Sequence, residues 1–271
     1  MKIFKCLALS TLVVSSLMLV SCEEVLENIL DIEIDDWASL VNEKKYETIV
    51  DGNTLSYGSH TYTIEGDLDA TGLIGRYDSP TTSVSFTNIP SGYNEFSAVY
   101  NGLLGKSIQG TAAMIPMAIE IYAREPYTGE RCLELLCYDK STVKEILSVL
   151  KERFRKNEYG GENDPYIQRY LPAALLKGAT PKNAYRPSEP YMVEMCPSVN
   201  KPQSISSGID NFVYILCKGW DTGGYNYAQR QVEIIQPKGG GLYKVFSCPS
   251  TYVQCKNCGH LERFEIKLYK F

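Results

Sequence analysis

The sequence predicts an α+β fold, in which a helical segment is followed by an antiparallel β-meander and preceded by a small β-rich region. Three observations support this prediction. Between residues 111 and 177, apolar side chains recur at helical spacing. From Tyr191 onward they alternate with polar ones, as in half-buried strands. Residues 47–100 are rich in Gly, Ser, Thr and Tyr, and turn residues separate their short β-like runs.

The chain begins like an exported protein. Two early lysines precede an apolar run, Leu7–Val20, which suits a signal peptide and is short for a membrane-spanning helix. The run ends in Leu19-Val20-Ser21-Cys22, which resembles the lipobox of bacterial lipoproteins. The resemblance implies cleavage after Ser21 and attachment of two or three acyl chains to Cys22. Two or more acyl chains anchor a protein stably, whereas one anchors it only weakly. The alternatives are an uncleaved membrane helix or cleavage without a lipid.

Two acidic residues, Glu23 and Glu24, follow the cysteine. This resembles the surface-export signal of Bacteroidota lipoproteins. We therefore expect a lipid-anchored protein of the bacterial outer membrane, either on its periplasmic side or at the cell surface.

The charge of the chain is unevenly distributed. Its formal net charge is −5, but residues 22–78 hold 14 acidic and 3 basic residues, against 18 and 22 in residues 79–271. No Lys/Arg-dense run is present, so we do not expect nucleic acid as a partner. From the charge shift and the change of pattern we predict the domains: signal peptide 1–21, acidic tether or helix 22–46, β-rich segment 47–96 and α+β main domain 97–271.

Four helices are expected. Met114–Arg124 is the first, with Pro116 tolerable only in its first turn, and Glu130–Tyr138 is the second. The third begins with Thr142 and Glu145 as a capping box. Its apolar face, expected to pack on the meander, comprises Val143, Ile146, Leu147, Leu150 and Phe154. The fourth is Tyr166–Lys177.

Strands are expected on both sides of the helical segment. Before it we predict short β-like runs at Thr61–Glu65, Ser83–Thr87 and Phe96–Tyr100. After it we predict Met192–Cys196, Asn211–Cys217, Gln231–Ile235, Leu242–Ser247 and Arg263–Tyr269, with a glycine-rich turn at 237–241.

One stretch resembles a known family. The runs Pro165-Tyr166-Ile167, Gly178–Tyr185 with Pro187, Gln231–Ile234 and Leu242–Ser247 are similar to an uncharacterised bacterial domain of unknown function, over about residues 97–256. The resemblance implies a shared fold and no particular chemistry.

Part of a calcium-loop pattern lies between residues 67 and 78. Asp67, Asp69 and Thr71 are spaced as oxygen ligands, a glycine follows, and Asp78 is at the position of the final carboxylate. The final residue of such a loop is usually Glu, and the flanks do not read as helices. Either calcium binding or an acidic surface turn is consistent with this pattern.

The cysteines near the C-terminus form a second candidate. Cys248, Cys255, Cys258 and His260 resemble one knuckle of a zinc ribbon, but a second Cys-x₂-Cys is missing. Zinc binding, a disulfide from Cys248 to Cys255 or Cys258, and free thiols all remain open. Outside the cytoplasm a disulfide is chemically allowed.

Few residues suggest catalysis. His60 and His260 are the only imidazoles, and His60 lies in a turn-like context. No motif of a hydrolase nucleophile or phosphate loop is present, so we predict no catalytic residue, metal or cofactor. The segment Trp220–Tyr227 could present aromatic rings to a sugar. We expect a non-enzymatic binding or envelope-associated module with a glycan or envelope protein as partner, and a glycan hydrolase using carboxylates as the alternative.

Overall fold

The computed structural model describes residues 45–68, 79–154 and 168–258. The chain separates into two units, 1–43 and 44–271, and all the described residues belong to the second. The expected signal peptide, Cys22, at which lipid attachment is expected, and nearly all of the expected acidic tether lie outside the described residues, as does the strand expected at Arg263–Tyr269.

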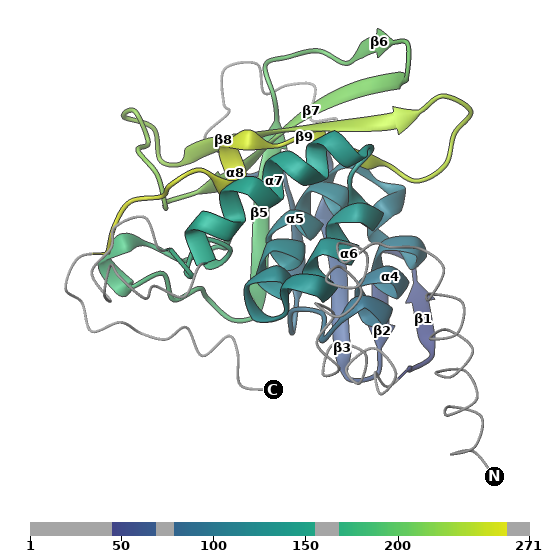
Figure 1. Ribbon diagram of the computed structural model, residues 1–271, viewed down its shortest axis with the longest axis horizontal. Coiled ribbons are helices and arrows are strands. Elements are labelled where there is room, and N and C mark those ends of the chain that lie inside the picture. The colour runs from purple at the N-terminus through teal and green to yellow at the C-terminus, as the bar shows by residue number, and fades with distance from the viewer. Residues whose placement is uncertain (1–44, 69–78, 155–167, 259–271) are drawn as a thin grey trace, which may run out of the picture. The chain divides into compact units, whose positions relative to one another are not determined.

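The described unit is built on an antiparallel sheet (Figure 1). Along the sheet the strands follow the order β1-β2-β3-β4-β5-β7-β8-β9, and β6 pairs with one end of β7. The strands are β1 (Thr48–Asp51), β2 (Thr54–Tyr57), β3 (His60–Gly66), β4 (Thr82–Phe86), β5 (Tyr191–Pro197), β6 (Gln203–Ile205), β7 (Gly208–Cys217), β8 (Ala228–Pro237) and β9 (Lys244–Ser247). The sequence therefore correctly predicts an α+β fold with an antiparallel meander and a β-rich N-terminal region.

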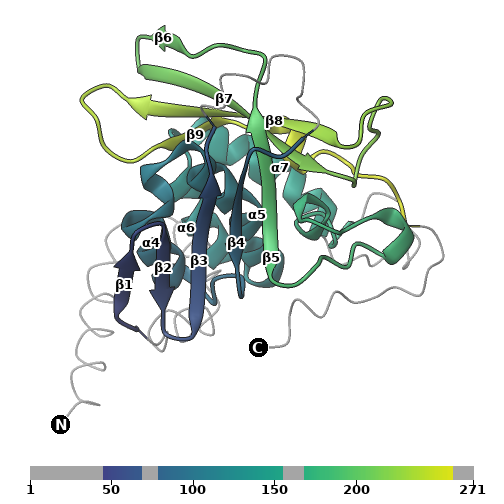
Figure 2. The same ribbon diagram turned by 180° about the vertical axis from the view of Figure 1, so that it is seen from behind.

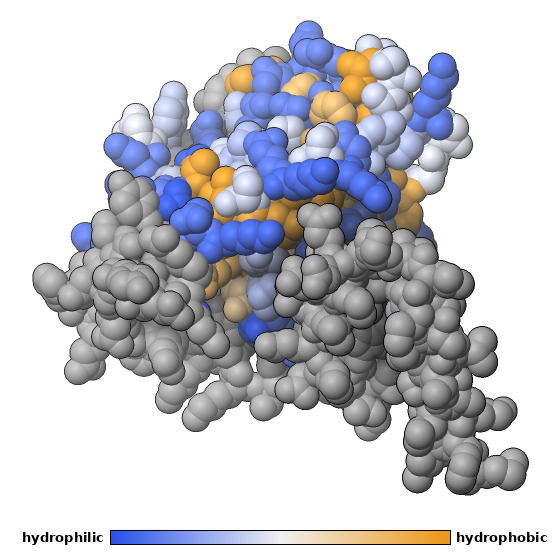
Figure 3. All heavy atoms as spheres, in the orientation of Figure 1, coloured by the Kyte–Doolittle hydropathy of each residue, from blue (hydrophilic) through white to orange (hydrophobic). Residues whose placement is uncertain are grey.

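The main helices cover one face of this sheet. They lie in front of the strands in Figure 1 and behind β3, β4 and β5 in Figure 2. They are α4 (Tyr93–Gly102), α5 (Ile108–Arg124), α6 (Pro126–Leu136) and α7 (Lys140–Phe154), with the short α8 (Pro249–Tyr252) and the 3₁₀ turns Leu104–Lys106, Ala173–Leu175 and Pro181–Asn183. Seen from the helix side, the upper part of the described surface is mostly hydrophilic, with apolar residues showing between (Figure 3).

Alternation along the strands defines an inner and an outer face of the sheet. In β4, Val84 is buried, while its neighbours Ser83 and Ser85 are half-buried. Its cross-strand partner in β5 is Val193, which is also buried. Both valines belong to the hydrophobic core that includes the helices. The inner face therefore packs on α4–α7, and the outer face is the side turned away from them.

The run Phe96–Tyr100 is helical, so the strand predicted there is wrong. Phe96, Val99 and Tyr100 are fully buried and recur at the i, i+3, i+4 spacing of one helix face. The β-branched and aromatic composition that favoured a strand serves instead to pack α4 on β2. In a short run this composition does not distinguish the two structures.

Helix α5 begins six residues before the predicted Met114, so Pro116 lies inside it and not in its first turn. The cap is Ser107, whose Oγ accepts a hydrogen bond from the Gly110 amide at 3.1 Å. Proline removes one backbone donor from the helix. Burial along nearly the whole of α5 compensates, because packing outweighs the intrinsic preference of one residue.

The capping box predicted at Thr142 is also wrong. The Asp139 carboxylate accepts the Thr142 amide at 2.9 Å, so it caps the helix that begins at Lys140. The Thr142 hydroxyl donates to the Phe246 carbonyl, and the Glu145 carboxylate accepts from the Tyr252 hydroxyl. The predicted apolar face is buried in the core that also holds residues of the meander, and α6 and α8 are the helices in contact with α7.

The predicted fourth helix is absent from the described residues 168–177, where only the 3₁₀ turn Ala173–Leu175 forms. Pro172 lacks the amide that a helix would need there. The side chain of Gln168 is held by the Cys255 backbone instead, donating to its carbonyl and accepting from its amide, each at 2.8 Å.

The sheet contains strands from both sides of the domain boundary predicted between residues 96 and 97. That boundary lies within α4, and β4 pairs along its whole length with β5. The strands of the β-rich segment and those of the meander therefore belong to one sheet. Whether residues 97–271 fold alone is a separate question, addressed in the Discussion.

Candidate functional site

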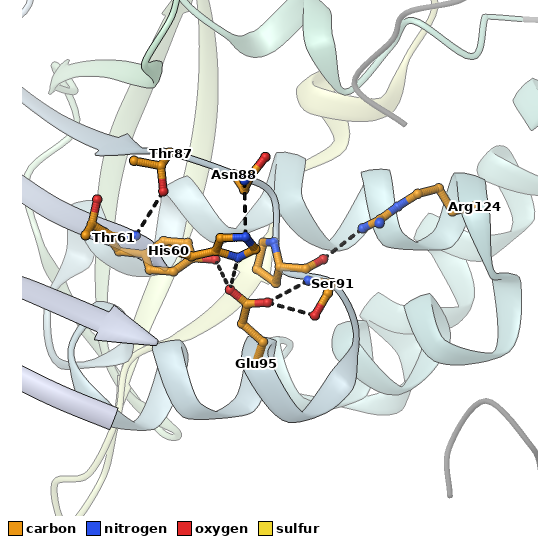
Figure 4. Close-up of polar contacts among 9 residues, drawn as sticks. His60, Thr61, Thr87, Asn88, Ser91, Glu95 and Arg124 are labelled. Atoms are coloured by element: carbon orange, nitrogen blue, oxygen red, sulfur yellow. Dashed lines mark hydrogen bonds and ion pairs between the residues drawn. The ribbon is translucent and has the colours of Figure 1, made fainter. Parts of the chain in front are cut away.

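The described imidazole, His60, takes part in a polar network (Figure 4). His60 is the first residue of β3, directly after the β2–β3 turn. Its Nδ1 lies 2.6 Å from Oε1 of Glu95 in the first turn of α4, and its Nε2 lies 3.1 Å from Nδ2 of Asn88. An amide nitrogen can only donate, so Nε2 accepts and the proton of the neutral ring is on Nδ1.

Glu95 is the centre of this network. Its side chain is 2% exposed, which would be costly for a carboxylate without partners. Oε1 also accepts the Tyr62 hydroxyl at 2.7 Å, and Oε2 accepts the Ser91 amide and hydroxyl, each at 2.8 Å. Burial and then the Glu95 charge raise the pKa of Tyr62 well above its usual value, so the phenol stays a donor.

The same contacts fix the connection between β4 and α4. Thr87 exchanges hydrogen bonds with the backbone of Thr61, and the Pro90 carbonyl accepts from the Arg124 guanidinium at 2.8 Å. Asn88 lies between these two points, and Ser91 follows Pro90 directly. The network therefore determines where α4 leaves the sheet.

Its chemistry is that of a structural network rather than a hydrolase. A carboxylate that orients histidine Nδ1 is one half of a catalytic triad, and the other half is a nucleophile facing Nε2. Here Nε2 faces an amide donor, and the Ser91 hydroxyl is bonded to Glu95. We therefore interpret His60 as structural, in line with the turn-like context of its sequence.

Two carboxylates come close together elsewhere. Asp210 in β7 pairs with Ile235, and Phe212 pairs with Glu233, so the two acids are diagonal neighbours on the outer face. Asp210 is 6% exposed, and its Oδ1 has no hydrogen-bond partner among the described residues. Burial raises the pKa of Asp210. Burial and then the Asp210 charge raise the pKa of Glu233.

The outer face also carries many half-buried polar side chains. Across β2, β3 and β4 these are hydroxyls, and the Thr54 and Thr63 oxygens lie 3.0 Å apart. In the next strands the outer face carries Tyr214 and Gln231, which are cross-strand partners. The hydroxyl residues are Thr54, Ser56, Thr61, Thr63, Ser83 and Ser85.

An ion pair borders these groups. Lys177 lies 2.8 Å from Glu194 of β5, which is cross-strand from Ser83. A hydrogen bond to Glu194, followed by its charge, raises the pKa of Lys177. The pair shows that this face holds a fixed charge pattern as well as hydroxyls.

The aromatic segment Trp220–Tyr227 is only partly available to a ligand. Trp220 is 6% exposed and the Arg230 guanidinium lies 4.7 Å from its ring centre, so this ring of the segment is not available to a sugar. Tyr225 is 57% exposed, and Lys218 lies 5.4 Å from the ring centre of Tyr227.

The cysteines expected to act together are free thiols in the structure. Cys248 and Cys255 are buried, which raises the pKa of each thiol to about 12. Cys255 packs against Gln168, whereas Cys248 begins the turn into α8. Within the described ranges no group of three or more His, Cys, Asp or Glu side chains is arranged to hold a metal. His260 lies outside these ranges.

The calcium pattern cannot be assembled from the described residues. Asp67 follows β3 and is exposed, while Asp69, Thr71 and Asp78 lie outside the described residues. Calcium binding by this segment stays a prediction.

The sequence missed Glu95 and its partners. Glu95 is 35 positions from His60 and 33 from Tyr62. These residues come together only because the first turn of α4 lies beside the start of β3, and no local motif signals that contact.

The fold and the polar groups define the class of this protein. It is an α+β domain with one antiparallel sheet and helices on the inner face. Its outer face carries polar side chains across β2–β4 and both polar and apolar ones across β5, β7 and β8. A family model described as Domain of unknown function (DUF6935) matches residues 88–258, more than half of the chain. The chain therefore belongs to that family, which agrees with the resemblance to an uncharacterised domain.

No curated protein and no solved structure matches the chain. Among the described residues, no helix is both long and apolar enough to cross a bilayer.

Proposed function

We propose that this protein is a lipid-anchored, non-enzymatic binding module of the bacterial cell envelope, whose outer sheet face recognises an envelope glycan. The anchor is supported by the sequence Leu19-Val20-Ser21-Cys22 after a short apolar run. Acyl chains on Cys22 would hold the chain at the outer membrane, on its periplasmic side or at the cell surface.

The observation that carries the binding function is the outer face itself. Its hydroxyl, amide and carboxylate groups both donate and accept hydrogen bonds, as a polyhydroxylated ligand requires. Tyr214 adds a half-buried ring among them. Rings whose faces are apolar and whose hydroxyls stay hydrated suit the faces of sugar units.

The anchor is tested by Cys22→Ala. We expect the parent to incorporate radiolabelled fatty acid and to enter the detergent phase on Triton X-114 separation. The variant should do neither. If the variant is labelled and partitions like the parent, the anchor assignment fails, whatever the outer face binds.

The binding face is tested by titrating the purified chain with soluble peptidoglycan fragments and with polysaccharide released from lipopolysaccharide. We expect saturable binding to one of them, weakened at least about tenfold by Tyr214→Ala, the usual loss for an aromatic contact. Glu134→Ala, an exposed change on α6, should bind like the parent.

Asp210 and Glu233 favour the hydrolase as the second candidate, because glycoside hydrolysis uses two nearby carboxyls of which one is protonated. An assay for new reducing ends in the same glycan mixtures distinguishes the two functions. New reducing ends that are lost in Asp210→Asn would identify a hydrolase and overturn the non-enzymatic assignment.

A further inference from the structure

The strand at one end of the sheet, β1, is unusually exposed. All four of its residues are exposed, with Ile49 at 58% and Val50 at 48%. On one side β1 pairs with β2, and no described strand pairs with its other side. An edge with apolar, β-branched residues and free backbone groups is a template for another strand.

Residues 45–47 precede β1 and are not part of a strand, but Tyr46 among them lies beside the end of β2. The ring of Tyr46 lies 5.5 Å from that of Tyr57, the residue next to Thr48 in β2, and it is 46% exposed. Thr48 and Val50 lie on the inner side near Gly102 of α4. By alternation Ile49 and Asp51 face the outer side. Extending β1 back to Lys45 places that side chain on the same side.

We propose that β1 pairs antiparallel with β1 of a second copy of this chain, with the two-fold axis passing beside Thr48. A two-fold axis perpendicular to the sheet places identical strands antiparallel and keeps the helices of both copies on one side. In this register Lys45 lies opposite Asp51 of the second copy, and Tyr46 lies opposite Val50. Two symmetric ion pairs and two aromatic–aliphatic pairs result.

Charge selects this register over its neighbours. An axis beside Ile49 would place Glu47 opposite Asp51 of the second copy. An axis beside Glu47 would place the two Glu47 side chains opposite each other. Both arrangements set like charges face to face, which destabilises a sheet pair. The axis beside Thr48 is the register of these three that pairs opposite charges.

The contact is small, so the dimer should be weak. Edge pairing over one short strand falls below the area of a standard stable interface. Two anchored copies on one membrane would be concentrated near each other, which favours weak association. The proposal itself does not require the anchor, since it rests on β1 alone.

The first test is a charge swap, read by sedimentation equilibrium on the chain from Glu23 onward, which contains every described element. The parent should form a dimer at high protein concentration. Lys45→Asp or Asp51→Lys alone should raise the dissociation constant at least about tenfold, because like charges then meet. The double variant should return to within about threefold of the parent.

A parent that sediments as a monomer at every concentration overturns the proposal. So does a double variant that stays as dissociated as the single ones while its circular dichroism and Tm match the parent. Both residues are exposed, so we expect each variant to fold.

The second test is independent of charge. In the proposed register the two Thr48 residues are adjacent across the axis, so Thr48→Cys should form a disulfide-linked dimer under mild oxidation by a glutathione disulfide buffer. The control is Ser59→Cys, which is exposed in the β2–β3 turn and should show only the parent's background of crosslinking. Equal crosslinking of the two variants overturns the register.

Discussion

At the scale of the residue, the buried carboxylate of Glu95 is the group that most needs hydrogen-bond partners. It accepts from His60, Tyr62 and both donors of Ser91. A buried charge is stable only when it is well hydrogen-bonded, so these partners and the carboxylate depend on one another. Their arrangement explains why His60 is half-buried, because both of its ring nitrogens have hydrogen-bond partners.

We predict that Glu95→Ala lowers the free energy of unfolding by about 3 kcal/mol or more, because it leaves the donors of Tyr62, His60 and Ser91 without their acceptor, and each unsatisfied buried donor costs about 1–3 kcal/mol. Urea denaturation followed by circular dichroism measures it. His60→Ala should cost less, because its side chain is 18% exposed and water can replace part of what is lost. Glu134→Ala, exposed on α6, should stay within about 0.5 kcal/mol of the parent. Equal costs for the Glu95 and Glu134 variants would contradict the network.

Asp210 makes a different prediction, because its buried carboxyl has an oxygen without a partner among the described residues. Its pKa is raised in the folded state by burial. The folded state therefore favours the neutral carboxyl. The free energy of unfolding gained from this group is fully present below its unfolded pKa and is lost as pH rises through the higher folded pKa. Asp210→Asn should therefore be more stable than the parent at neutral pH, and the gain should vanish in acid. Urea titrations at several pH values measure this, and a loss of stability at neutral pH would show that the charge is compensated.

At the scale of the element, helix α7 shows how a correct helix can have an incorrectly predicted start. The apolar spacing predicted the buried face, because the spacing along one helix determines which residues share a face. The cap could not be chosen from sequence, since both Asp139 and Thr142 are good capping residues. Tertiary contacts decide between them. The Thr142 hydroxyl donates to the carbonyl of Phe246 in β9, and Glu145 accepts from Tyr252 in α8, so neither side chain is available for a capping box.

We predict that Asp139→Ala lowers the free energy of unfolding by about 1 kcal/mol, the usual contribution of an N-cap. Hydrogen bonds from the Thr142 amide and then the Ser141 hydroxyl lower the pKa of Asp139. Its stabilisation is therefore present above the unfolded pKa and is lost as pH falls through the lower folded value. Thr142→Ala should cost less than Asp139→Ala if Asp139 is the cap. The reverse order would favour the predicted capping box.

For the strands, prediction from sequence depended on whether one side of the strand is buried. The alternation in β3, β4, β5, β7 and β8 was readable because one side of each strand is buried in the helical core. β1 was not predicted, because all of its residues are exposed and no alternation marks it. The helix α4 was read as a strand because its buried face consists of residues that both structures accept.

At the scale of the whole molecule, the sequence could suggest regions but not how they join. The change in charge near residue 79 marks a real change in composition, yet β4 pairs with β5 across more than a hundred positions. Such a long-range pairing leaves no local signal. For the same reason the polar outer face, assembled from β2–β5, β7 and β8, could not be recognised before the strands were ordered.

We predict that residues 97–271 alone will not unfold cooperatively. The fragment would expose the edge of β5 and lose the core residues Tyr62, Val84 and Phe86, which are at most 1% exposed in the chain. Residues 45–271 should show one cooperative transition on heating. A cooperative transition of the shorter fragment would establish the boundary expected from charge and composition.

The measurement that tests the central claim most directly is hydrogen–deuterium exchange of the purified chain with and without the glycan fragment that it binds in titration. We predict that slowed exchange concentrates in the strands whose outer faces carry the polar side chains described above, namely β3, β4, β5, β7 and β8, and leaves α6 and α7 unchanged. Protection confined to the helices, or no binding of any envelope glycan, would contradict the assignment of the outer face as the binding surface.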